Sequence, residues 1–328
     1  MNRFTKQLLP FCSLIFIFSL CTFLEPDSFL SSANLLDVLC RSSVNGIIAA
    51  GMTYIIITGG IDLSVGSMLA MCGMIGSFSM LFLSGGTWAD ISTGAIIPMK
   101  TGIMIVGTFI SIAAGALCGF ANGMLITRLK LAPFIVTLGT MSIFRGISLI
   151  MNDGKSFKVW DYTWLDTGRV FGIIPSSILL LVIIMAAAGF LLKNTRFGRY
   201  TYAIGSNTQT AFHAGVNVNR TLVWIYTLTG ALVGLAAMIL TSRAISSQPT
   251  AGISLELDII AACIIGGCAP SGGRGTMIGT VIGTLLISFL RNGLTLLGIS
   301  TNVQLVVIGL IIIVAVTADQ FATRRKAT

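Results

Sequence analysis

Asp62 is the residue of this sequence whose type and position most clearly suggest chemistry. It lies in the segment Gly59-Gly-Ile-Asp-Leu-Ser-Val-Gly-Ser67, between two apolar runs, where an ionisable group is costly and is by default a candidate for function. Its carboxylate could couple transport to an ion, or it could accept amide hydrogen bonds at the start of the next helix. With Gly60, Ser64 and Gly66 it forms a predicted translocation or gating element.

Nucleotide chemistry is not predicted for this chain. The segment Gly266-Gly-Cys-Ala-Pro-Ser-Gly-Gly-Arg274 has two glycines at the spacing of a Walker A loop, but it lacks the Lys and the Ser or Thr that reach the phosphates and Mg²⁺. His213, the single histidine, has no evident metal or nucleophilic partner, and we interpret it as a solvated loop residue. We therefore expect no catalytic residue, cofactor or metal site, and no ATP hydrolysis by this chain alone.

Glycines form a second pattern near the C-terminal end. Gly275, Gly279 and Gly283 recur at the spacing of a small-xxx-small helix face, which lets two helices approach closely. Gly266 and Gly267 precede this run. Helix packing is the favoured interpretation of these glycines and substrate contact is the alternative, so Gly266 and Gly267 are also candidates for gating.

The elements that must position these residues are membrane-spanning helices. Hydrophobic residues make up 55% of the 328 and charged residues only 9%, whereas soluble proteins have about 25% charged residues. The mean hydropathy is +0.94, and at about 20 residues per span the chain has room for about ten spans. We predict an all-α polytopic membrane protein with a single transmembrane domain over residues 1–328. The seven cysteines lack metal-ligand spacing and fit small apolar positions.

Ten spans can be placed along the chain. They are expected near residues 8–24, 44–58, from the junction at 59–67 to 83, 102–126, 133–151, 176–192, 221–241, 257–266, 276–297 and 303–317. The junction at 59–67 is expected to be a broken helix or a tight interfacial turn, because non-helical backbone at membrane depth needs surrounding protein or water. An arrangement of eight spans, without the weak second or eighth span, is the alternative.

Basic residues predict the orientation. The formal charge of +9 comes from Lys and Arg between the spans, which favours the positive-inside bias over nucleic-acid binding. Arg3 and Lys6 at one end, and Arg324, Arg325 and Lys326 at the other, predict that both termini are cytoplasmic. Residues 25–43, 84–101, 152–175 and 242–256 are then expected outside.

The longest polar interruption, residues 193–220, is predicted to lie on the cytoplasmic side. Basic residues crowd its ends, namely Lys193, Arg196, Arg199 and Arg220. Within it, Asn207 is a capping residue before a short helix-permissive run, and Gly215 follows that run. The pattern predicts one short surface helix.

Several motifs together resemble the ribose-type sugar ABC importer permeases. They are Gly59-Gly-Ile-Asp-Leu-Ser-Val-Gly-Ser67, Thr195-Arg-Phe-Gly-Arg199, Ala203-Ile-Gly-Ser-Asn207, Ala214-Gly-Val-Asn-Val-Asn-Arg220, Gln248-Pro-Thr-Ala-Gly252, Glu256-Leu-Asp258 and Gly266-Gly267. They cover nearly the whole chain in the family's order. The turn at residues 267–272 departs from the Thr-Ser-Leu-like sequence expected there.

The resemblance implies a membrane subunit of the bacterial inner membrane that works with a second permease subunit, two cytoplasmic ABC ATPase subunits and a periplasmic sugar-binding protein. It also implies about ten helices, as in the vitamin B12-type ABC importer permease fold. The short surface helix would be the coupling helix that docks on the ATPase. Its candidate contacts are Asn207, Ala211, Phe212, His213, Ala214 and Gly215.

Other functions remain open at this point. A secondary sugar transporter could use Asp62 for proton or sodium coupling, and a passive channel would require selectivity rings that the sequence does not reveal. Within the ABC class, a nucleoside or a furanone-like molecule could replace the sugar. The sequence identifies neither the sugar nor a homodimeric or heterodimeric pair.

Overall fold

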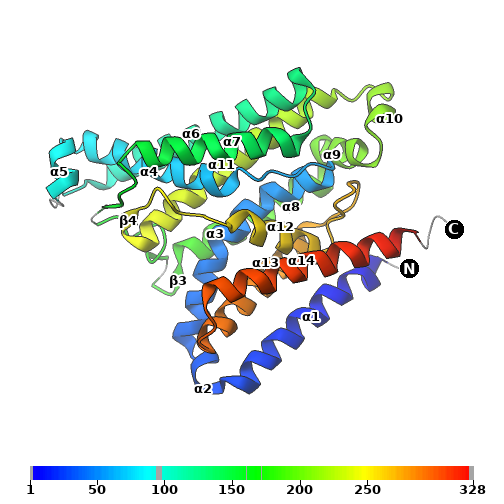
Figure 1. Cartoon of the computed structure of the whole chain (residues 1–328), viewed down its shortest axis with the longest axis horizontal. Helices are drawn as coiled ribbons and strands as arrows, with labels where there is room; N and C mark the ends of the chain where they lie inside the picture. Colours follow the sequence, from blue (N-terminus) through cyan, green and yellow to red (C-terminus); the bar gives the residue numbers. More distant parts are fainter. Residues whose placement is uncertain (1–2, 94–97, 160, 171, 325–328) are drawn as a thin grey trace. The chain divides into compact units, whose positions relative to one another are not determined.

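The computed structural model describes residues 3–93, 98–159, 161–170 and 172–324, and helices dominate them (Figure 1). The longer helices are α1 (Arg3–Leu24), α3 (Ser32–Ile57), α4 (Val65–Leu83), α6 (Thr101–Leu129), α7 (Pro133–Ile150), α8 (Ser176–Asn194), α9 (Arg196–Ser206), α11 (Val218–Ala244), α12 (Leu255–Ile265), α13 (Met277–Leu296) and α14 (Thr301–Arg324). The shorter helices are α2 (Pro26–Phe29), α5 (Trp88–Thr93) and α10 (Thr208–His213). Arg325 and Lys326, used above for the C-terminal orientation, lie outside the described residues.

Four short strands complete the described secondary structure. Strand β1 (Phe157–Lys158) pairs antiparallel with β4 (Ser246–Ser247), with Phe157 opposite Ser247. Strand β2 (Arg169–Val170) pairs antiparallel with β3 (Ile174–Pro175). The first pair ties the segment after α11 to the segment between α7 and α8.

Seven helices within the described residues are long and apolar enough to cross a membrane, namely α3, α4, α6, α7, α8, α11 and α13. Shorter apolar stretches cover Pro10–Leu24 of α1 and Thr301–Val314 of α14, and α12 has 11 residues against the roughly 20 of a full span. The prediction of a mostly helical polytopic membrane protein is confirmed. The number of ten spans stays a prediction.

Most predicted boundaries agree with the helix ends, but α3 differs. It begins at Ser32, so the predicted span at 44–58 is the second half of a longer helix, which also includes residues 32–43 of the segment predicted to lie outside. The Ser31 hydroxyl caps α3 by accepting the Asn34 amide at 3.3 Å. Asp37 and Arg41, which belong to this helical part, form an exposed ion pair of 2.8 Å along the helix.

The chain divides into two compact units, each assembled from distant segments. Unit 1 comprises Met1–Gly60, Met185–Val218 and Leu257–Thr328. Unit 2 comprises Ile61–Ile184 and Asn219–Glu256. The boundary between Gly60 and Ile61 falls within the predicted gating segment at 59–67. The boundary after Glu256 coincides with the end of the predicted outside segment at 242–256.

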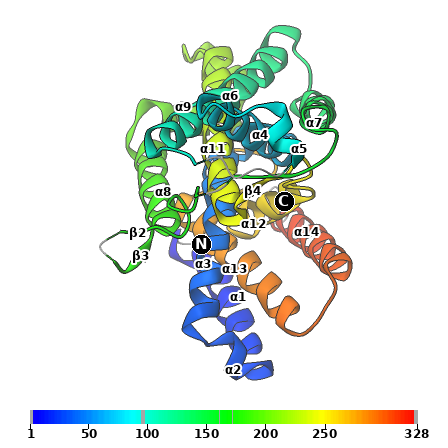
Figure 2. The same ribbon diagram turned by 90° about the vertical axis from the view of Figure 1, so that its left-hand side faces the viewer.

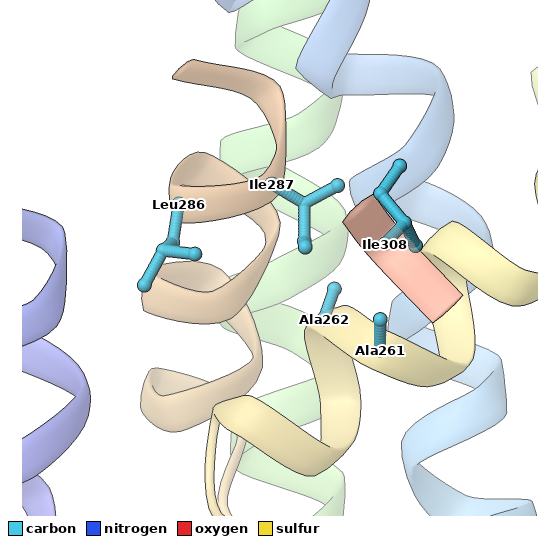
Figure 3. Packing of buried hydrophobic residues seen from close by; sticks show 5 residues of the cluster. All are labelled: Ala261, Ala262, Leu286, Ile287 and Ile308. Carbon is cyan, nitrogen blue, oxygen red and sulfur yellow. The ribbon is translucent and has the colours of Figure 1, made fainter. Parts of the chain in front are cut away.

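In unit 1, α13 packs against α3 and α1. A buried apolar cluster joins three helices through Ala261 and Ala262 of α12, Leu286 and Ile287 of α13, and Ile308 of α14 (Figure 3). The glycine pattern contributes here, because a Cβ on Gly279 would collide with the carbonyl oxygen of Gly266. Close packing of α12 on α13, the favoured interpretation of these glycines, is confirmed.

A buried ion pair adds a polar link to the same unit. The Arg291 guanidinium on α13 lies 2.7 Å from the Asp258 carboxylate on α12, and their side chains are 24% and 5% exposed. Breaking such a pair from one side strands a buried charge, so both residues are expected to matter for folding.

In unit 2, α4 packs against α6 and α7, and α6 approaches α11 closely (Figure 2). A Cβ on Gly115 of α6 would collide with the Gly230 carbonyl oxygen of α11, and the Ser111 hydroxyl donates to the Gly234 carbonyl oxygen at 2.9 Å. Small residues therefore bring these two helices into backbone contact, as is common in membranes.

Candidate functional site

The predicted break between two spans is present, and glycines close the first helix. Helix α3 ends at Ile57, and residues 58–64 are not helical before α4 begins at Val65. Gly59 has φ +81°, and the Gly60 amide donates to the Ile55 carbonyl oxygen at 3.0 Å. Gly59 thus occupies the left-handed position that ends α3 and favours a residue without Cβ, and the Gly60 amide completes this helix terminus.

Asp62 organises the non-helical segment that follows. One carboxylate oxygen accepts the Ser64 amide at 2.8 Å and the Ser64 hydroxyl at 2.6 Å, and Asp62 is only 1% exposed. The N-cap position of α4 is Ser64, whose side chain makes no cap bond. The predicted capping role therefore needs a correction: Asp62 forms a turn two residues ahead of the N-cap, through the local side-chain bonding typical of aspartate.

Neighbouring helices of unit 2 hold this turn. The Asn122 amide on α6 donates to the Ser64 hydroxyl at 2.9 Å, and the Thr137 hydroxyl on α7 donates to the Ile61 carbonyl oxygen at 3.3 Å. Asn122 Oδ1 and the Tyr226 hydroxyl are buried atoms without a hydrogen-bond partner among the described residues. Sequence reasoning missed Asn122 and Tyr226, although a polar amide inside an apolar span was a usable signal.

Residues 245–254, within the segment 242–256 that is predicted to lie outside, run along α4. Their side of the membrane stays a prediction. The Ser247 hydroxyl donates to the Met74 sulfur at 3.2 Å, and a Cβ on Gly66 would collide with the Gly252 carbonyl oxygen and the Glu256 carboxylate. Met74 and Gly66 are separated by about 12 Å of helix. Gly66 therefore provides the space that lets this segment reach the start of α4.

Arg145 on α7 fastens the same segment. Its guanidinium donates to the carbonyl oxygens of Pro249 and Ala251, both at 2.8 Å, and the Ser148 hydroxyl also donates to the Pro249 carbonyl oxygen at 3.1 Å. The sequence could not name partners for Arg145. Non-helical backbone exposes carbonyl groups that a helix would satisfy internally, and Arg145 satisfies two of them.

A cavity of about 380 Å³ lies between α4, α11 and the 245–254 segment. Thr241 and Ser247 lie at its buried floor, whereas Gln248 and Thr250 are exposed at its rim. The remaining lining comprises Leu69, Ala70, Gly73, Ala237, Leu240, Ala244, Ser246, Ala251, Gly252 and Ile253. The wall is thus partly apolar and partly made of hydroxyl and amide groups.

Residues 193–220, the predicted coupling segment, contain two helices, α9 and α10. The short helix predicted after Asn207 is confirmed by α10. Asn207 Oδ1 accepts the Thr210 amide at 2.9 Å at the start of α10, and Gly215 follows its end with φ +84°. Helix α9 is anchored in unit 1, because the Tyr202 hydroxyl donates to the Gly275 carbonyl oxygen at 2.8 Å and a Cβ on Gly205 would collide with the Ile57 carbonyl oxygen.

The predicted ATPase contacts on α10 do not share one environment. Phe212 is 65% exposed, and Asn207, His213, Ala214 and Gly215 are exposed too. Ala211, by contrast, is 3% exposed, and α10 packs against α9. Ala211 is therefore suited to hold α10 in place and not to touch a partner directly.

The predicted gating residues fall into separate groups. Asp62, Ser64 and Gly66 belong to unit 2 and lie around the start of α4, whereas Gly60 belongs to unit 1 and bonds back to the last turn of α3. Gly266 packs against Gly279, and Gly267 forms the turn after α12 with φ +94°. Taken together, the seven long apolar helices and the hydrogen-bonded, non-helical segments between them define a multi-pass membrane protein, and such interrupted spans are common in transporters.

The chain belongs to a permease family, described as branched-chain amino acid transport system / permease component, whose model matches residues 34–316. It is 44% identical to a ribose import permease protein of Bacillus subtilis, over 96% of this chain and 93% of that protein. It is 39% identical to a ribose import permease protein of Haemophilus influenzae, over 99% and 96%, respectively. It is 36% identical to a D-allose transport system permease protein of Escherichia coli, over 92% and 87%. No solved structure matches the chain. These relatives confirm the resemblance to ribose-type permeases.

Proposed function

We propose that this chain is the membrane-spanning permease subunit of an ATP-driven importer that moves a monosaccharide, a ribose-like pentose or a hexose. The observation that carries the proposal is the similarity along nearly the full length to permease proteins named for ribose and D-allose import. Similarity confined to a few helices would support only a common fold. Here it includes the segments around Asp62 and Phe212, which hold the candidate gating and coupling residues.

The proposed assembly follows from the same family. Two permease subunits, each a single domain over residues 1–328 with about ten spans of the vitamin B12-type fold, associate with two cytoplasmic ABC ATPase subunits. A periplasmic binding protein delivers the sugar. The complex lies in a bacterial inner membrane with both termini of this chain in the cytoplasm.

Energy would enter through the coupling segment at 193–220. Phe212 offers an exposed apolar side chain on α10, which suits an anchor in a partner's groove. Helix α9 contacts the end of α3 at Ile57 and the glycine turn at Gly275. A displacement of α10 by the ATPase would therefore press on the end of a long span and bias a two-state arrangement of the helices.

The ion-coupled alternative is less well supported. Asp62 is buried, but one of its oxygens accepts both the amide and the hydroxyl of Ser64, which gives the carboxylate a structural role in the turn before α4. The chain's similarity is to permease proteins of import systems. A nucleoside or furanone-like cargo would be supported only if the cognate binding protein preferred it to sugars.

The test is purification of the chain together with its cognate ATPase and binding protein, followed by a ligand screen of that binding protein. The proposal predicts recovery of all three components and selective binding of D-ribose or D-allose. A binding protein that prefers L-leucine would contradict the sugar assignment, and stable purification without any ATPase would contradict the ABC assignment.

A further inference from the structure

We infer that the cavity between α4, α11 and the 245–254 segment is a binding station for the neutral sugar within this subunit. The inference rests on the proposed function, which it extends by placing the cargo against named residues. Every lining residue belongs to unit 2, so this one unit forms the whole wall.

The size of the cavity fits a small ligand. Its volume of about 380 Å³ lies within the range of roughly 300–1,000 Å³ that small-molecule sites occupy. Its floor is buried, since Thr241 is 4% and Ser247 is 1% exposed, and its rim is open at Gln248 and Thr250. A ligand can therefore enter from the rim and rest against a buried floor.

The chemistry of the wall selects against charge. None of the lining residues is ionisable, whereas Ser246, Ser247, Gln248, Thr241 and Thr250 supply hydroxyl and amide groups. A zwitterionic amino acid or a sugar phosphate would enter without an ionic partner, at a high desolvation cost. A neutral polyol can exchange its hydrogen bonds with water for bonds to these side chains.

The apolar residues of the cavity wall also suit a sugar ring. Leu69, Ala70 and Leu240 face the same cavity and can cover the C–H face of a sugar ring. With few polar groups and no charge, the station would hold the sugar weakly. Weak binding suits transport, because a cargo must leave a site as readily as it enters.

Three variants test the station in the assembled complex: Thr241→Val, Ser247→Ala and Gln248→Leu. Proteoliposomes containing this chain, its ATPase and its binding protein are supplied with D-ribose or D-allose. Each lost neutral hydrogen bond corresponds to about a two- to tenfold effect, so uptake should fall by that factor and the ratio of the two sugars should change. Stimulation of ATP hydrolysis by the loaded binding protein should persist.

Thr229→Val is the matched control, because Thr229 is a buried threonine of the same helix α11 that bonds the Ile225 carbonyl oxygen at 2.9 Å and does not line the cavity. It should leave the sugar ratio unchanged. The inference is overturned if the three cavity variants transport both sugars like the wild type, or if uptake and ATPase stimulation fall together at a constant sugar ratio. If the wild-type complex transports neither sugar, the proposed function itself fails.

Discussion

Replacing Arg145 with methionine should release the 245–254 segment from α7. The substitution keeps much of the side-chain volume but removes two charge-assisted hydrogen bonds, to the carbonyl oxygens of Pro249 and Ala251, each of 2.8 Å. Hydrogen bonds to charged groups contribute about 1.5–3 kcal/mol, so the lower limit for two bonds is about 3 kcal/mol. The Ser148 bond to Pro249 remains in the variant and retains part of the attachment.

Hydrogen exchange measures this release directly. A local loss of about 3 kcal/mol corresponds to opening that is roughly 100-fold more frequent, so the backbone amides of residues 250–254 should exchange faster by about that factor. Sugar uptake should fall as well, because this segment forms one wall of the cavity.

Arg41→Met serves as the control for Arg145→Met. Arg41 pairs with Asp37 in an exposed position, and such surface pairs contribute about 0–1 kcal/mol, so exchange in residues 250–254 should not change. If Arg145→Met leaves exchange in this segment at the wild-type rate, Arg145 does not fasten it.

Substitutions at Asp62, Gly66 and Phe212 give three further predictions. Transport should survive Asp62→Asn better than Asp62→Leu, because the asparagine oxygen can still accept from Ser64; equal and complete loss at normal membrane abundance would instead support ion coupling. Gly66→Ala should destabilise the protein by about 1–3 kcal/mol in thermal unfolding, since its Cβ would meet the Gly252 carbonyl oxygen, whereas Gly139→Ala meets nothing within 4 Å; similar melting of the two variants would refute the contact. Phe212→Ala should weaken ATPase association by roughly 30-fold, the equivalent of about 2 kcal/mol, and wild-type recovery in a pull-down would exclude this anchor.

Local patterns predicted much of the secondary structure. The start of α7 at Pro133, the cap of α10 at Asn207 and the glycine end of α3 at Gly59 all depend on residues within a few positions of each other. Hydropathy likewise located most of the spans, because their length and apolar composition are properties of a continuous segment.

Two kinds of feature could not be predicted from these patterns. The start of α3 was placed too late because hydropathy does not register a polar helical segment such as the one that begins after the Ser31 cap. The other features depend on distant partners. The path of residues 245–254 along α4 depends on Gly66 and Arg145, which are more than 100 positions away in sequence. The burial of Ala211 depends in the same way on tertiary packing, which the composition of α10 does not encode.

Reconstituted transport is the most direct test of the central claim that this chain imports a sugar with energy from a partner ATPase. Proteoliposomes should contain this chain with its cognate ATPase and binding protein, and uptake of D-ribose should be measured with ATP, without ATP, and without ATP under a proton or sodium gradient. D-ribose uptake is expected only with ATP, and the Phe212→Ala variant should lose this uptake. Uptake driven by an ion gradient in the absence of the ATPase would contradict the central claim.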